Sequence, residues 1–274
     1  MMSVLGALRY HLHRLLRPTP SVPAYESFAR PSEDSETYEE PAILEVVVKK
    51  TELVRDRLRS GGRREVSTRQ SVQDAVVLTY ARGLAALNVL DHGGACGASF
   101  FELDHLLPGL IAKWRVVETE AMARAARQVF QEERICFYSD LDEAVQEMPT
   151  RDLLMASGVL QYLPDPVSGL SHLLDLGFSY LYVTRTPVTA EFKRPLIGKQ
   201  VAWLSAHGPG PMPPGIPDRK VSCPITLVPE DQLLQSLSDS HARALCFSEG
   251  EEKTMKFGGQ PVVVKDIGFL LQRV

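Results

Sequence analysis

A glycine-rich segment follows a short apolar run between residues 88 and 104. In VLDHGGACGASFFEL, a predicted strand is followed by Gly93, Gly94 and Gly97 and then by the start of a helix. Glycine tolerates backbone angles that other residues avoid, and its missing side chain lets a ligand approach the main chain. The pattern indicates either a ligand-binding turn or a tight strand-to-helix connection without a ligand.

An acidic residue ends the next apolar run, WRVVETE. Glu118 comes about 20 residues after the glycines, the spacing at which an acid in dinucleotide-binding folds accepts hydrogen bonds from ribose hydroxyls. Glu120 is the alternative, and a solvated charge at a strand end is the simpler explanation of either residue. Turn and acid together favour a ligand that carries a ribose.

The strands and helices that position these residues are predicted by the alternation of apolar runs with longer segments. Apolar runs separated by segments long enough for a helix are typical of βαβ units and a parallel sheet, and the runs are NVLDHGG, WRVVETE, RICFYSD, RDLLMASG and YLYVTRTP. After Val188, the run HGPGPMPPGIP predicts a lid loop over residues 205–220. Two strands, RALCFSEGE and VKDIGFLLQRV, joined by KFGGQP, are expected at the C-terminus.

The first part of the chain, residues 1–86, is predicted to form a helical cap. Leucines recur at helical spacing in MMSVLGALRYHLHRLLRP, and residues 42–58 and 68–86 predict two further helices around the breaker RSGGRR. The polar, proline-containing segment 18–41 predicts a flexible linker. The first helix fits packing on its own domain or contact with a membrane surface. Residues 87–274 then form the α/β domain.

Bulk properties exclude some functions. Lys and Arg number 30 against 34 Asp and Glu, a net charge of -4 that disfavours nucleic acid as a partner. The sequence has no apolar run long enough to predict a transmembrane helix. Its four cysteines lack metal-ligand spacing, so we expect no metal site and reduced thiols in a cytoplasmic protein. The expected partner is a small molecule, and the oligomeric state stays open.

Two motifs carry a resemblance to a known family. VLDHGGACG resembles the first motif of class I S-adenosylmethionine (SAM)-dependent methyltransferases, and DLLMASGVLQYLPDP resembles their fourth. With YLYVTRTPV, they are similar to a bacterial group of methyltransferase-type proteins associated with polysaccharide or secondary-metabolite biosynthesis, over most of the chain from about Thr37. The turn departs from the GxGxxG of nicotinamide enzymes.

The resemblance implies a Rossmann-like seven-stranded sheet, mostly parallel with a C-terminal antiparallel strand, behind an N-terminal helical cap. It also implies roles toward SAM. The methionine portion would be lined by Asp91, Gly93, Gly94 and Gly97, the ribose held by Glu118, the adenine flanked by Asp140 and Leu141, and the sulfonium covered by Ser157 and Gly158. Asp142 competes with Asp140, and a helix N-cap explains either.

Two further residues of the turn carry chemistry. His92 is either a turn residue or a contact to the SAM carboxylate, and Cys96 is expected to be a packing residue because the sequence places no base beside it.

On the acceptor side, the candidates are Tyr162, Arg185 and His207. They follow the fourth predicted strand, end the fifth and open the lid loop, respectively. A hydroxyl acceptor needs a base, and a guanidinium can bind a carboxylate or phosphate through two hydrogen bonds. The alternatives are aromatic packing for Tyr162, a structural ion pair for Arg185 and simple exposure for His207.

The expected function is methylation of an O or N atom of a small molecule or sugar intermediate. Two alternatives use the same fold. In a SAM cyclase, the α-amine attacks its own γ-carbon, forms an azetidine ring and releases methylthioadenosine. The third possibility is an inactive scaffold. The motifs do not separate these functions.

Overall fold

The computed structural model describes residues 21–22, 24–25, 39–61, 69–81, 83, 86–238 and 242–273. The leucine-rich helix predicted near the N-terminus and most of the predicted linker lie outside these residues.

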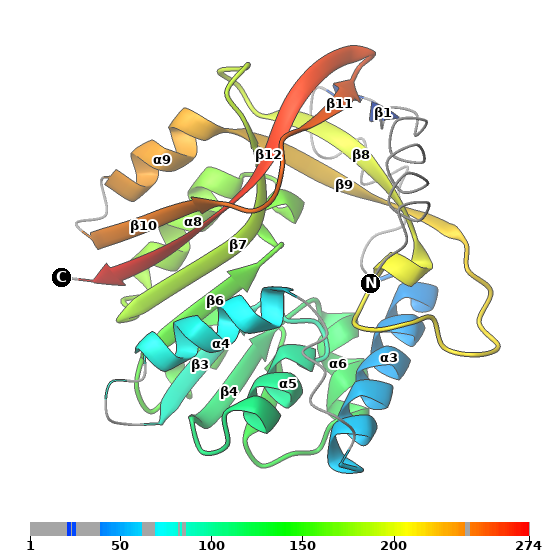
Figure 1. Cartoon of the computed structure of the whole chain (residues 1–274), viewed down its shortest axis with the longest axis vertical. Helices are drawn as coiled ribbons and strands as arrows, with labels where there is room; N and C mark the ends of the chain where they lie inside the picture. Colours follow the sequence, from blue (N-terminus) through cyan, green and yellow to red (C-terminus); the bar gives the residue numbers. More distant parts are fainter. Residues whose placement is uncertain are drawn as a thin grey trace, which may run out of the picture.

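The centre of the fold is a mostly parallel sheet (Figure 1). Strands β5, β4, β3, β6 and β7 lie side by side in that order and run parallel, at Ile135–Tyr138, Ile111–Val117, Leu87–His92, Leu153–Ser157 and Tyr180–Thr189. Next to β7, β12 (Gln260–Arg273) is antiparallel and pairs in turn with β10 (Ala242–Ser248). The predicted Rossmann-like, mostly parallel sheet with a C-terminal antiparallel strand is confirmed; its seven strands are part of a sheet that has 12 strands among the described residues.

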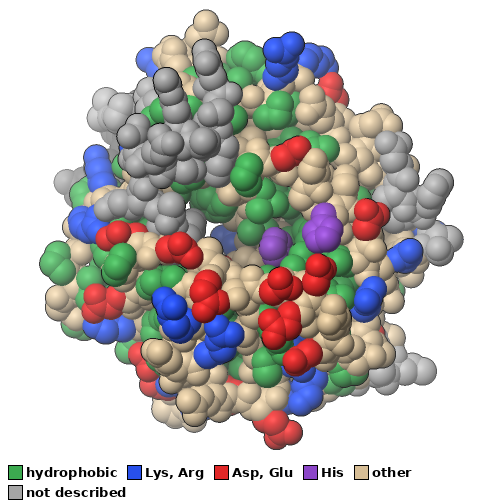
Figure 2. Space-filling view, turned by 180° about the vertical axis from the view of Figure 1, so that it is seen from behind, with side chains coloured by type: hydrophobic (Ala, Val, Ile, Leu, Met, Phe, Trp, Pro, Cys, Tyr) green, Lys and Arg blue, Asp and Glu red, His purple; other side chains and the backbone are tan. Residues whose placement is uncertain are grey.

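Helices cover both faces of this sheet, so its parallel strands are apolar on both sides. One face packs against α3, α4, α5 and α6, at Pro41–Arg59, Arg69–Ala81, Ala98–Leu106 and Glu120–Val129. The other packs against α7, α8 and α9, at Leu141–Gln146, Pro166–Asp175 and Glu230–Ser238. On the side seen in Figure 2, acidic and basic side chains are interspersed.

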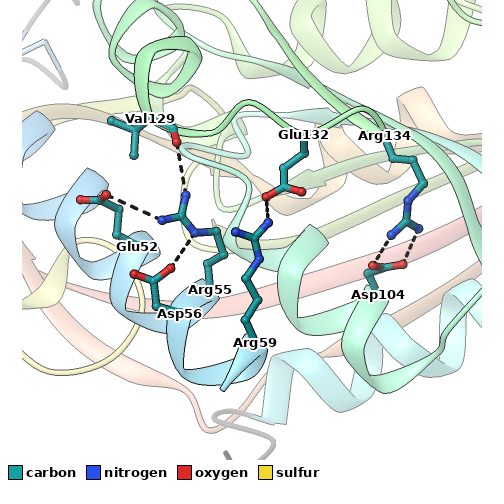
Figure 3. Close-up of polar contacts among 8 residues, drawn as sticks. All are labelled: Glu52, Arg55, Asp56, Arg59, Asp104, Val129, Glu132 and Arg134. Carbon is teal, nitrogen blue, oxygen red and sulfur yellow. Dashed lines mark hydrogen bonds and ion pairs between the residues drawn. The ribbon is translucent and has the colours of Figure 1, made fainter. Parts of the chain in front are cut away.

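Two of the predicted cap helices are present, as α3 and α4. Ile43, Val46 and Val47 of α3 enter the same core as the sheet. Its C-terminal half is also held by polar contacts (Figure 3): Arg55 donates to the carbonyl of Val129 at 3.2 Å, and Arg59 pairs with Glu132. Helix α3 is therefore fixed on the α/β domain by apolar and charged contacts.

A β-hairpin whose strands were not predicted flanks the predicted loop. Strands β8 (Leu196–Trp203) and β9 (Lys220–Pro229) pair from Leu196 opposite Leu227 to Trp203 opposite Lys220. The Gly/Pro-rich segment forms the hairpin tip, preceded by the 3-10 turn η2 (Leu204–Ala206). Strand β9 is hard to predict because it contains Pro224 and Pro229. Proline lacks a backbone N–H donor, so its presence argues against a strand.

Three more short strands correct the predicted loops. Strands β1 (Ser21–Val22) and β2 (Ala24–Tyr25), inside the predicted linker, pair with β11 (Lys253–Phe257) and β8. The predicted connection KFGGQP is a tight turn of Gly258 and Gly259 between β11 and β12, with φ of 56° and 83°. Positive φ at both central residues is a feature of the type I′ turn, one of the two common two-residue hairpin connections.

Lys50 joins α3 to the hairpin tip. Its side chain is buried, and Nζ donates to the carbonyls of Ser205 at 2.7 Å and His207 at 2.8 Å. Burial lowers the pKa of Lys50, and the charge of Asp218 opposes that shift. The Lys50 ammonium thus provides the hydrogen bonds that these two backbone carbonyls would otherwise receive from water.

We expect Lys50→Met to lower the free energy of unfolding by about 3 kcal/mol, because two buried carbonyls lose a charged donor. Lys49→Met is the matched control: Lys49 makes an exposed ion pair with Glu45, and its loss should cost less than about 0.5 kcal/mol. Urea unfolding measures both, and amide exchange over residues 204–207 should accelerate only in Lys50→Met. Equal stability of the two variants would refute the role of Lys50.

Candidate functional site

The glycine-rich turn between β3 and α5 has no room for side chains. Gly93 and Gly97 have φ of 74° and 72°. A Cβ on Gly93 would lie 2.6 Å from Cγ2 of Val159, and one on Gly97 would lie 2.4 Å from Cδ1 of Ile135. On Gly94 it would meet the Asp91 carboxylate at 2.3 Å. Backbone angle and close packing together explain the glycines at these three positions.

A buried acid, Asp91, lies beneath the turn. Its side chain accepts a hydrogen bond from Nε1 of Trp114 at 3.1 Å and is 3% exposed. Burial raises the pKa of Asp91 to about 7 despite that hydrogen bond, and the charges of Asp74 and Glu118 raise it further. Asp74 belongs to α4 and is itself buried. Sequence reasoning missed Asp74, although it shares a helical face with the apolar Val77 and Leu78.

Glu118 closes the turn from the end of β4. One carboxylate oxygen accepts from the backbone N–H of Ala95 at 3.0 Å, and the other from that of Thr119 at 2.9 Å. Burial raises the pKa of Glu118, while the two backbone hydrogen bonds lower it. Each oxygen keeps a second lone pair that can accept from a hydroxyl. Glu120 is instead exposed at the start of α6 and pairs with Arg127.

We expect Glu118→Ala to weaken SAM binding by about ten- to hundredfold while the protein stays folded, because charge-assisted hydrogen bonds are lost at a half-buried position. Glu120→Ala is the control and should bind like the unaltered protein. Isothermal calorimetry measures both affinities. The assignment fails if Glu118→Ala retains full affinity or if Glu120→Ala loses it.

The other predicted cofactor residues lie at the same edge, because the carboxyl ends of parallel strands meet there. Asp140 follows β5 and caps α7, where its carboxylate accepts from the N–H of Glu143 at 2.8 Å, and Leu141 begins that helix. Ser157 ends β6, and its hydroxyl lies 2.5 Å from that of Thr184. Gly158 follows with φ of 67°. The N-cap explanation of Asp140 is therefore realised, and its role toward adenine stays a prediction.

The three acceptor-side candidates contact different elements. Tyr162 donates to Oε1 of Gln200 on β8 at 3.0 Å, and Arg185 donates to the hydroxyl and carbonyl of Ser157 at 3.1 and 2.8 Å. His207 is buried at the hairpin tip, not exposed, and its carbonyl binds Lys50. Burial lowers the pKa of His207, and the charge of Lys50 adds to the effect. The imidazole of His207 is thus neutral at physiological pH.

Burial shifts the pKa values of two more residues of the turn, His92 and Cys96. Burial lowers the pKa of His92 to about 4, and nearby His172 adds to the shift. Cys96 is buried with its sulfur 3.5 Å from that of Met122, and burial raises its thiol pKa to about 12. Cys96 therefore packs as a neutral thiol. Figure 2, which views the molecule from behind Figure 1, shows a hollow in the surface beside two histidine side chains.

The described part of the chain contains neither a candidate metal cluster nor a candidate membrane span. No group of three or more His, Cys, Asp or Glu side chains there could hold a metal ion. Within the same residues, no helix is both long and apolar enough to span a membrane.

Comparison with known proteins yields matches among solved structures. No family model matches the sequence, and no curated protein matches it. The magnesium protoporphyrin IX methyltransferase of Synechocystis PCC 6803 with bound SAM shares 14% identity, over 74% of this chain and 78% of that one, at a TM-score of 0.42.

Two methyltransferases from other bacteria give similar values. A sugar N-methyltransferase of Streptoalloteichus sp ATCC 53650 shares 14% identity over 79% of this chain and 92% of that one, with a TM-score of 0.46. An amino pentose methyltransferase of Micromonospora echinaspora with bound SAM shares 10% over 74% and 90%, also at 0.46. At these identities the likeness is one of fold alone.

Proposed function

We propose that this protein is a SAM-dependent methyltransferase that acts on an O or N atom of a small molecule. The observation that carries the proposal is the turn after β3, which is closed to side chains and tied to Glu118 through the N–H of Ala95. Such a turn brings bare backbone to a ligand, and Glu118 offers the acceptor that a ribose needs.

The charge of this turn fits SAM better than a dinucleotide. Three carboxyl groups gather around it, those of Asp91, Asp74 and Glu118. The pKa of Asp91 is about 7, so a nearby ammonium or sulfonium of SAM would favour its ionised form and be attracted by it, whereas a pyrophosphate would be repelled by that form. We assign the methionine portion to Asp91 and the three turn glycines, and the ribose to Glu118.

The remaining cofactor roles follow from strand order. Asp140 and Leu141, after β5, lie beyond Glu118 and would flank the adenine, while Ser157 and Gly158, on the other side of β3, would face the sulfonium. SAM supplies an activated methyl group, whose transfer needs no acid on the leaving thioether. The chain's task is therefore to align the acceptor and exclude water.

The hairpin β8–β9 is suited to cover the acceptor. It is held in the middle of β8 by Tyr162 through Gln200 and at its tip by Lys50, so it bridges the strand edge and α3. We propose that residues 205–220 act as the lid of the site and that Tyr162 and His207 lie on the acceptor side. The four cysteines are free, which fits the cytoplasm as the location.

Reaction products test the proposal. The protein should bind SAM and S-adenosylhomocysteine but not NAD, and with a methyl acceptor it should release S-adenosylhomocysteine. Methylthioadenosine formed from SAM alone, faster than spontaneous breakdown, would instead establish the cyclase. Binding of SAM without turnover across a broad acceptor library would favour an inactive scaffold, and tight NAD binding without SAM binding would refute the cofactor assignment.

A further inference from the structure

Arg185 has an uncommon backbone conformation at the carboxyl end of β7. Its φ is 55°, in the left-handed region that few residues other than glycine adopt. The pairing of β7 with β12 explains the position: Val183 lies opposite Phe269 and Thr186 opposite Ile267, so Thr184 and Arg185 both face Gly268. Such a bulge turns a side chain away from its regular direction.

The bulge directs the Arg185 side chain back across β6. Its Nε donates to the Ser157 hydroxyl at 3.1 Å and its Nη2 to the Ser157 carbonyl at 2.8 Å. A Cβ on Gly158 would lie only 3.1 Å from the guanidinium carbon, so the guanidinium rests against the glycine backbone. Glu249 fixes the bulge itself by accepting from the backbone N–H of Arg185. The guanidinium is therefore held in place without an ion pair.

The Arg185 guanidinium forms no ion pair within the described part of the chain; its charge acts on the buried Asp91 at longer range and lowers the pKa of that carboxyl. Arg59, Arg134 and Arg219 pair with carboxylates, whereas the Arg185 guanidinium hydrogen-bonds only to Ser157 among the described residues. Two of its five N–H groups are used, and the others stay available to a ligand. The side chain is also exposed, so a ligand can reach it.

The backbone of Arg185 lies two strands away from the glycine turn, while its side chain contacts Ser157 and Gly158. β3 carries the glycine turn and β4 carries Glu118, while Arg185 belongs to β7, two strands away from β3 on the opposite side. Neighbouring strands are about 4.8 Å apart, so the β7 backbone is roughly 10 Å from that of β3, and the Arg185 side chain extends part of this distance to Ser157 and Gly158. Ser157, which would face the sulfonium, lies between them. A group bound by the free edge of Arg185 would therefore lie beside the proposed sulfonium position, on the β7 side away from the glycine turn, where an acceptor can approach.

We propose that the acceptor carries an anionic oxygen group, a carboxylate or a phosphate, and that Arg185 binds it through the free edge of its guanidinium. This inference rests on the proposed methyl transfer. A planar guanidinium matches both oxyanions through paired hydrogen bonds, which a lysine cannot reproduce. Ser157 and Gly158 hold Arg185 in the orientation that presents this edge.

Simple anions test the proposal without knowledge of the acceptor. Inorganic phosphate and acetate are titrated separately into protein saturated with S-adenosylhomocysteine, and NMR line widths of each anion report binding. We expect at least one anion to bind, Arg185→Gln to weaken that binding at least tenfold and Arg185→Lys to weaken it less. Arg124→Gln, at an exposed arginine of α6, is the control and should bind like the unaltered protein. The anion preferred identifies phosphate or carboxylate.

A second variant separates function from folding. Arg185→Gly suits the left-handed backbone, so it should fold at least as well as Arg185→Gln and still lose the anion. The proposal is overturned if neither anion binds, if Arg185→Gln binds them unchanged, or if that variant loses S-adenosylhomocysteine affinity while it keeps the anion. Should no variant bind S-adenosylhomocysteine, the cofactor proposal fails, and the same titration of cofactor-free protein still decides the role of Arg185.

Discussion

Gly93→Val should abolish measurable SAM binding, a loss of at least a hundredfold. A valine at φ of 74° is strained, and its Cβ would lie 2.6 Å from the side chain of Val159. Strain and overpacking each cost about 1–3 kcal/mol, so the turn must open and lose the bare backbone that approaches the ligand. Calorimetry with SAM measures the loss, and circular dichroism checks that the sheet is retained.

Gly109→Val is the matched control for this experiment. Gly109 also has a left-handed backbone, with φ of 79°, but no atom lies within 4 Å of the position of its Cβ. It follows α5, away from the turn, so the substitution reproduces the strain without the clash. We expect lower stability and unchanged SAM affinity. If Gly93→Val binds SAM as well as Gly109→Val does, the turn is not the cofactor site.

Asp91→Asn should stabilise the cofactor-free protein at pH 8 by up to about 4 kcal/mol. The pKa of Asp91 is about 7 in the folded protein, against an ordinary value of 3.8. The folded state thus binds more protons between these two values, and stability is lost as the pH rises through this range. Asparagine is neutral throughout and can still accept the Trp114 hydrogen bond, so it escapes that loss.

Urea unfolding at pH 4 and pH 8 measures the effect. The advantage of Asp91→Asn should be small at pH 4 and grow toward pH 8, and the same variant should bind the cationic cofactor more weakly. Asp142→Asn, at an exposed position of α7, is the control for removal of a carboxylate outside the core. Parallel stability curves for Asp91→Asn and the unaltered protein would show that Asp91 is not a buried ionisable group.

The parallel sheet was predictable because each of its strands carries its own signal. Runs such as RDLLMASG are apolar on both faces, and glycine or proline separates them from the helices. The hairpin β8–β9 was not predictable, because β9 contains two prolines and its partner β8 is half exposed, with Val201 and Trp203 facing outward. Such strands form because they pair with a partner strand elsewhere in the chain, and the local sequence carries no signal of that pairing.

The same distinction holds for the site. Gly93, Gly94 and Gly97 could be found because the turn needs glycines at fixed spacing. The burial of His207 could not be predicted, because it depends on Lys50 in a helix that is distant in sequence. Likewise, the bulge that directs Arg185 arises from one extra residue in β7 relative to β12, and β12 comes about 80 residues later in the chain.

The contact between Lys50 and the hairpin tip also sets an order for folding during synthesis. Lys50 is translated 155 and 157 residues before the carbonyls that accept its hydrogen bonds. At about 5–20 residues per second, this side chain stays hydrated for roughly 10–30 s after it leaves the ribosome. Helix α3 can dock on the first strands in that time, but its buried lysine is satisfied only when the hairpin arrives. The hydrogen bonds of Lys50 in α3 therefore depend on the last third of the chain. A truncation that removes Ser205 and His207 leaves the Lys50 ammonium without these two acceptors.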